Sequence, residues 1–104
     1  MNAAVDRLVG RVGHWEPPRW TAPTTPDGGE PSTRADLIFG LVQWLADLAA
    51  DAEGVVRRPV PRPANDPVLP DQVRVMVADL LFSDPPADVL SAAAARVDAT
   101  ARQL

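Results

Sequence analysis

The sequence contains no cysteine, no lysine and no tyrosine, and its single histidine is His14. Without cysteine, the chain can form no disulfide framework, thiol nucleophile or Cys-ligated zinc site. Without lysine, it has neither a Schiff base nor the lysine of a phosphate-binding P-loop. One histidine excludes a multi-histidine metal site within a single chain. We therefore expect no cofactor, no bound metal and no enzymatic activity.

The residues that are present suffice for one small core. The chain has 104 residues, 46% of them hydrophobic, and a formal net charge of -4. A chain of this length forms one domain, so we expect residues 1–104 to fold as a single helical unit. Alanine supplies seventeen of the hydrophobic residues, which leaves a lean core of larger side chains. All ten basic residues are arginine, a bias typical of very GC-rich bacterial genomes.

The N-terminal residues do not have the pattern of a signal peptide. Asp6, Arg7 and Arg11 interrupt the apolar residues before a hydrophobic run of about 7 can form. The longest nearly unbroken apolar stretch, residues 37–45, is far shorter than the ~20 residues of a membrane span. We therefore expect a cytoplasmic protein without a membrane partner.

The spacing of apolar residues predicts an all-α fold. Four segments have helical periodicity, and Pro-rich stretches separate them. The predicted helices cover residues 3–15, 33–53, 70–82 and 85–103. The predicted Pro-rich linkers cover residues 16–31 and 54–69. This pattern indicates a small irregular four-helix bundle with two long crossing segments.

The second predicted helix has the clearest boundaries. Thr33 and Asp36 have the spacing of a capping box, and Gly54 stands where a left-handed residue would end the helix. Apolar residues cover most of its circumference, so we expect it at the centre of the fold. Leu41 and Leu45 are expected in the core.

The last two predicted helices are separated by a short turn. Asp84, followed by two prolines, has the pattern of an N-cap for the last helix. Because the turn is short, we expect these two helices to be antiparallel neighbours. In the last helix Arg96 and Arg102 are balanced by two aspartates, whereas a DNA-recognition helix has basic surroundings. We therefore expect no nucleic-acid partner.

Residues 14–20, HWEPPRW, form the most unusual stretch. Trp and Arg are frequent interface hot spots, and the prolines preorganise the segment. Trp15 continues the apolar stripe of the first predicted helix and is expected to be buried, whereas Trp20 lacks such support and is expected at the surface. His14, Arg19 and Trp20 are therefore candidate partner-binding residues. The other interpretation, which we favour and which does not exclude partner contact, is that both Trp side chains fold back over the core.

A second candidate contact surface lies on the third predicted helix. Val75 and Phe82 are seven residues apart and lie off the main apolar stripe. A monomer would leave both side chains exposed, so we expect them to bind a partner or a second copy of the chain.

The charged residues give weaker signals. The pairs Asp47/Asp51 and Asp84/Asp88 have the spacing of a paired-acid or cation site, but no calcium-loop motif accompanies them. His14 has no G-x-S-x-G nucleophile motif to serve, so we assign no catalytic residue. The first helix presents a basic stripe and the second an acidic stripe, and we expect both to be exposed rather than to meet inside the fold. Their members are Arg7, Arg11 and His14, and Asp36, Asp47 and Asp51.

Two functions remain open at this point. The favoured one is a non-enzymatic helical protein-protein interaction module, a small accessory or adaptor subunit that self-associates or docks on a larger protein. The alternative is a small apolar-ligand-binding or sensing domain. In that case the pocket would lie between the second and third predicted helices and be bordered by Leu41, Trp44 and Met76.

Overall fold

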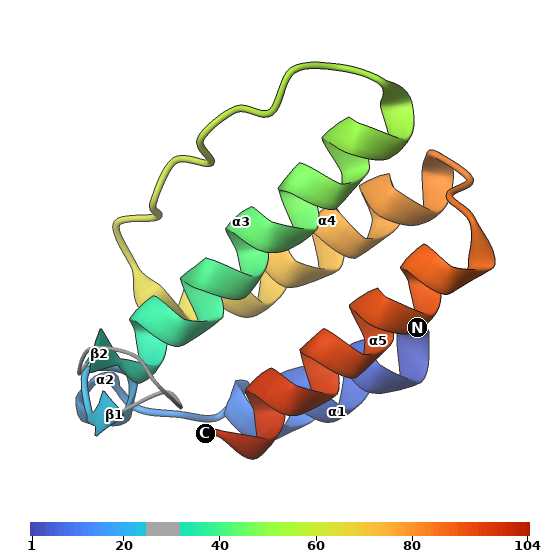
Figure 1. Ribbon diagram of the computed structural model, residues 1–104. Helices are drawn as coiled ribbons and strands as arrows, with labels where there is room; N and C mark the ends of the chain where they lie inside the picture. The colour runs from blue at the N-terminus through green and yellow to red at the C-terminus, as the bar shows by residue number, and fades with distance from the viewer. Residues whose placement is uncertain (25–31) are drawn as a thin grey trace.

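The computed structural model describes residues 1–24 and 32–104 (Figure 1). These residues are mainly helical, which confirms the predicted all-α class. The helices are α1 (Asn2–Val12), α2 (Pro17–Trp20), α3 (Arg34–Glu53), the short 3-10 helix η1 (Asp66–Val68), α4 (Leu69–Phe82) and α5 (Ala87–Arg102). Two short strands, β1 (Pro23–Thr24) and β2 (Ser32–Thr33), pair antiparallel, with Pro23 opposite Thr33 and Thr24 opposite Ser32.

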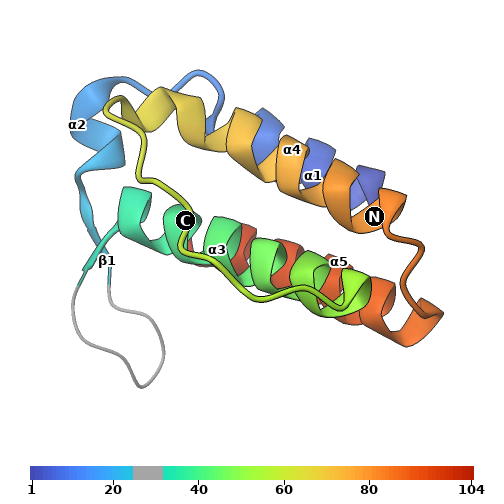
Figure 2. The same ribbon diagram turned by 90° about the horizontal axis from the view of Figure 1, so that it is seen from above.

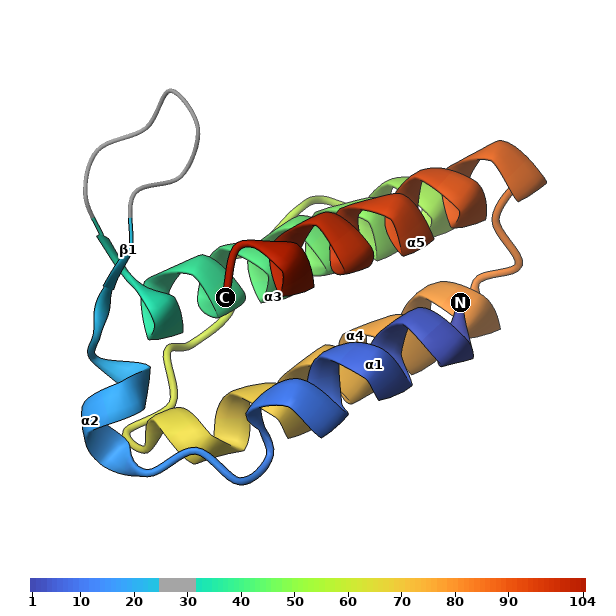
Figure 3. The ribbon, with the colours of Figure 1, turned by 90° about the horizontal axis from the view of Figure 1, so that it is seen from below.

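The four long helices lie in two layers, α1 with α4 and α3 with α5 (Figures 2 and 3). Across the layers, α3 packs most closely against α4, and α1 against α5. The members of each of these close pairs run in the same direction (Figure 1). Parallel neighbours that follow one another in the chain need a connection that returns along the whole helix. Residues 54–65 make that return between α3 and α4 (Figure 2).

Side chains of α3 hold the returning segment at three places: Asp51 pairs with Arg57, Asp36 pairs with Arg62, and Gln43 binds the backbone between them. Gln43 Oε1 accepts a hydrogen bond from the Val60 N–H at 2.7 Å, and Gln43 Nε2 donates to the Arg58 carbonyl at 3.1 Å. Proline favours extended backbone, which advances ~3.1 Å per residue against 1.5 Å in a helix. An extended segment therefore needs about half as many residues as a helix to cover the same length. This is how the returning segment can run back along α3, which has 20 residues.

The ends of α3 are as the sequence predicts. Thr33 Oγ1 accepts from the Asp36 N–H, and Asp36 Oδ2 accepts from the Thr33 N–H, both at 3.1 Å. Gly54 follows the helix in the left-handed conformation, with φ 72. Leu41 and Leu45 are buried in the core between the layers, which confirms their predicted position.

The first predicted helix is shorter than expected, and the segment after it is more structured. α1 ends at Val12 rather than at residue 15. Pro17 and Pro18 then open the unpredicted helix α2, because the first turn of a helix tolerates residues without an N–H. The predicted linker thus contains a helix and a strand in its described part, and its residues 25–31 lie outside the described residues.

Two predictions about the last turn are wrong. Asp84 is not an N-cap, because its φ is 52 and the capping position of α5 is occupied by Pro86. In addition, α4 and α5 run antiparallel but lie in different layers and are not close neighbours (Figure 3). The left-handed Asp84 and the extended Pro86 carry the chain away from α4, and α5 packs on α1 and α3 instead.

None of the helices in residues 1–24 and 32–104 combines the length and hydrophobicity that a bilayer crossing requires.

Candidate interaction surface

The HWEPPRW segment closes one end of the helical core. The rings of Trp15 and Trp20 pack edge to face, with centroids 5.1 Å apart and an interplanar angle of 70°. Trp15 is buried as predicted. Trp20 is only 1% exposed, so its predicted surface position is wrong. The reason is α2, which turns the chain back and brings Trp20 against η1 and α3.

The polar residues of this segment remain at the surface. The guanidinium groups of Arg19 and Arg34 each lie 5.5 Å from the centroid of the Trp15 ring, a cation-π distance. Arg19 and His14 are exposed and line an open depression of about 290 Å³ beside Trp15. Arg19 thus covers a buried aromatic ring, and the geometry favours the interpretation in which both Trp side chains cover the core.

The outer face of α4 carries a row of exposed apolar side chains that includes Phe82, the most exposed large apolar residue of the described part of the chain. Phe82 is 90% exposed, Val75 54% and Val68 42%. These three residues follow at steps of seven, so they share one face of the helix. We call this row the outer stripe. The exposure of Val75 and Phe82 is as predicted. Val68 was not predicted, because it was assigned to the linker, but its backbone is helical and it leads directly into α4.

Carboxylates flank the outer stripe. Asp71 lies three residues after Val68, and Asp79 lies three residues before Phe82, so both are neighbours of the stripe on the helix surface. Both are exposed, and neither forms an ion pair within the described part of the chain. Arg74, the one basic residue of α4, is paired with Asp6 of α1 at 3.1 Å. The surroundings of the outer stripe are therefore acidic.

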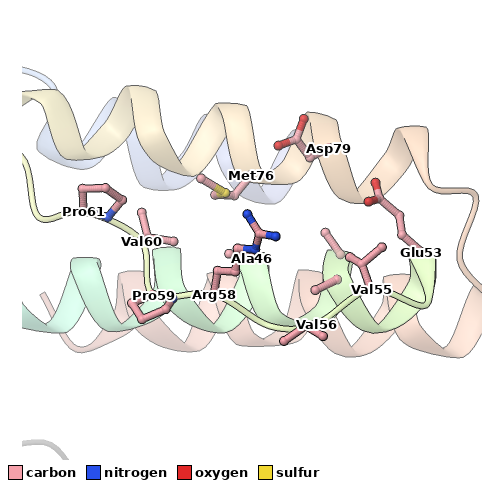
Figure 4. Close-up of a pocket in the computed structure, with 12 residues that line it drawn as sticks. Ala46, Glu53, Val55, Val56, Arg58, Pro59, Val60, Pro61, Met76 and Asp79 are labelled. Carbon is pink, nitrogen blue, oxygen red and sulfur yellow. The ribbon is translucent and has the colours of Figure 1, made fainter.

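A groove of about 540 Å³ runs beside the outer stripe, between α3, α4 and the returning segment (Figure 4). Its α3 wall is made of small residues, and Arg58 points into it from the returning segment (Figure 4). Met76 and Asp79 form the α4 wall, so Asp79 borders both the groove and the outer stripe. The main apolar lining residues are Ala46, Ala49, Ala50, Val55, Val56, Val60 and Met76.

The structure brings only one of the three predicted pocket residues to this groove. Met76 lines it, but Leu41 is buried in the core and Trp44 does not border it. Trp44 is half-buried beneath Arg96 of α5, whose guanidinium lies 5.1 Å from its ring centroid. Leu41 and Trp44 are misplaced in the prediction because the α3 wall is built by residues on a different face of that helix.

The basic stripe of α1 and the acidic stripe of α3 form no ion pairs with each other, as expected, and all their members are exposed except the half-buried Asp47. Arg7 pairs instead with Asp98 of α5 at 2.8 Å, and this hydrogen-bonded guanidinium lowers the pKa of the Asp98 carboxyl below its usual range. Arg57 lowers the pKa of Asp51 in the same way. Arg7 and Asp98, with Arg11 and Arg102, line a shallow depression of about 620 Å³ between α1 and α5.

The first pair of acids, Asp47 and Asp51, has structural partners in the fold. Asp47 accepts a hydrogen bond from Gln43 Nε2 at 3.0 Å, and Asp51 is paired with Arg57. Across residues 1–24 and 32–104, no group of three or more His, Asp or Glu side chains is placed to hold a metal ion.

No family model matches the chain, and no match was found among curated proteins or solved structures. The outer stripe and the groove are therefore interpreted from their own geometry and charge.

Proposed function

We propose that the protein is a non-enzymatic helical interaction module, a small accessory or adaptor subunit that acts by self-association or by docking on a larger protein. In this proposal the four long helices form an irregular bundle with Pro-rich crossing segments, and the described residues leave Val75 and Phe82 of α4 exposed. The single observation that carries the proposal is the 90% exposure of Phe82.

An exposed Phe is unfavourable for an isolated domain. Burying such a side chain stabilises a protein by about 1.5–3 kcal/mol. The exposed Phe82 does not contribute this stabilisation to the fold. Val75 and Val68 extend the exposure along the same helix face. Contiguous apolar surface rimmed by polar residues is typical of protein-binding sites. A partner that covers the outer stripe would recover the unused stabilisation.

Photo-crosslinking in the cells that produce the protein tests this proposal. A photo-reactive phenylalanine analogue is placed at position 82, and in a control protein at position 88, which is exposed on α5. We expect a discrete protein adduct from position 82 and none from position 88. Absence of an adduct at position 82, or equal adducts from both positions, would contradict the proposal. An adduct of twice the chain mass would identify self-association.

A small apolar-ligand-binding or sensing role is the second candidate. The groove beside Met76 supports it, since its volume of about 540 Å³ lies in the usual range for ligand pockets. Native mass spectrometry of the protein purified from its own cells separates the two candidates. A bound small molecule that is lost in the Ala46→Phe variant favours the ligand role. An unliganded protein that still crosslinks through position 82 favours the interaction module.

A further inference from the structure

We infer that the partner of the outer stripe is a basic amphipathic helix. The inference rests on the proposed function, in which the outer stripe contacts a protein. From Val68 to Phe82 the stripe extends over fourteen residue steps, which is about 21 Å of helix. A straight apolar row of this length fits the apolar face of a helix of about four turns, as in helix-in-groove recognition.

The charge of the partner follows from the flanks of the outer stripe. Asp71 and Asp79 are exposed on either side of it, and Glu53 lies at the end of the adjoining groove. Arg74 does not offset them, because it is already paired with Asp6. Lys or Arg residues beside the apolar face of an incoming helix would meet these carboxylates, which raises the association rate and orients the helix.

A second copy of the chain fits this surface less well. Pairing α4 with its own copy would bring two Asp71 and two Asp79 carboxylates around one apolar centre. Like charges facing each other across an interface weaken it. Arg58, the basic side chain that lines the groove, is one cation per copy against two carboxylates. The acidic flanks likewise disfavour nucleic acid and anionic lipid as partners.

The groove can accept side chains from one edge of the incoming helix. Ala46, Ala49 and Ala50 have short side chains, so the α3 wall leaves space next to Met76 of α4. An apolar side chain of the partner could enter there while neighbouring side chains cover Val75 and Phe82. Asp79, which borders both surfaces, would then lie beside the basic edge of the partner helix.

Three synthetic peptides provide the probe, each of about 18 residues so that it can form a helix. The first carries Leu along one helix face and Lys elsewhere. The second has the same residues in a shuffled order without an apolar face, and the third has Glu in place of Lys. Fluorescence anisotropy measures their affinity for the full chain. We expect the first peptide to bind at least about tenfold more tightly than either of the others.

Variants of the protein locate the binding site. Phe82→Ser should weaken binding of the first peptide by about tenfold or more, as removal of an interface aromatic does. Asp79→Asn should weaken it by about two- to fivefold at low salt, as loss of one exposed charge pair does. Asp88→Asn changes the net charge equally but lies on α5, which packs against α1 and α3 and not closely against α4, so binding should be unchanged. Circular dichroism of each variant confirms that it remains folded.

The possible failures are distinguishable. Equal binding of the shuffled peptide, or an equal effect of Asp88→Asn, would mean unspecific attraction to an acidic protein and would overturn the inference. Tighter binding of the Glu peptide would overturn it as well. If the crosslink from position 82 identifies a second copy, the proposed function holds and the inference fails. If neither a crosslink nor selective peptide binding is found, both fail.

Discussion

The indole rings of Trp15 and Trp20 pack edge to face with their centroids 5.1 Å apart, and Trp20 is among the largest fully buried side chains of the described residues. Together the two indoles close the end of the core where α1 ends and α3 begins. Arg19, between them in sequence, is exposed and lies 5.5 Å from the Trp15 ring centroid. The segment thus has a structural role that can be tested by substitution.

The first prediction is that Trp20→Ala lowers the free energy of unfolding by about 3 kcal/mol or more, because a large buried aromatic is removed. Trp15→Ala should be similarly damaging. Arg19→Ala, which removes an exposed cation-π contact, should cost less than about 1 kcal/mol. Chemical denaturation measures all three. A Trp20→Ala variant as stable as Arg19→Ala would mean that Trp20 is not part of the core.

The second prediction concerns α3. Leu41→Ala and Leu45→Ala should each lower the free energy of unfolding by about 2–5 kcal/mol, since both side chains are buried between the helix layers. Leu81→Ala is the matched control, because Leu81 is partly exposed on α4, and should cost less than about 1 kcal/mol. If either α3 variant unfolds at the same denaturant concentration as the Leu81→Ala control, α3 is not central to the core.

The third prediction is that the free energy of unfolding depends on pH through Asp36, at the start of α3. The pKa of Asp36 is lowered, first by the hydrogen bond from the Thr33 N–H and then by Arg62. The unfolded chain therefore binds a proton at Asp36 more readily than the folded chain does. The stabilisation is complete above about pH 4, the ordinary pKa of Asp, and is lost as the pH falls through the lower folded value.

Unfolding measured between neutral pH and about pH 2 checks this dependence. Asp36→Asn retains an oxygen that can accept from Thr33 but cannot be titrated. The variant should be less stable than the wild type at neutral pH, and the difference should shrink as the pH falls below about 4. A difference that stays constant over this range would contradict the assignment.

Local signals explain what could be predicted from the sequence. The ends of α3 were predictable because Thr33, Asp36 and Gly54 act through contacts within a few residues. The burial of Trp20 was not, since it depends on α2 meeting η1, which lies more than forty residues further along the chain. The placement of α5 beside α1 was missed for the same reason, because a short turn limits the distance between helix ends and not the choice of packing partner.

The candidate interaction surface was only partly predictable. The spacing of Val75 and Phe82 showed that both lie off the core stripe, and continuing that spacing backwards by seven residues would have found Val68. The groove could not be predicted, because Arg58 and Val60 reach it only through the path of the returning segment. That path depends on tertiary contacts with α3, which are the two hydrogen bonds of Gln43 and the ion pairs of Arg57 and Arg62.

The central claim is that the outer stripe serves contact with a partner and not the stability of the fold. Its most direct test is the free energy of unfolding of the double variant Val75→Ser/Phe82→Ser, measured by chemical denaturation of the monomer against the wild type. Because both side chains are largely exposed, the account predicts a difference within about 0.5 kcal/mol. A loss of about 2 kcal/mol or more would show that these residues belong to the core of the protein and would contradict the claim.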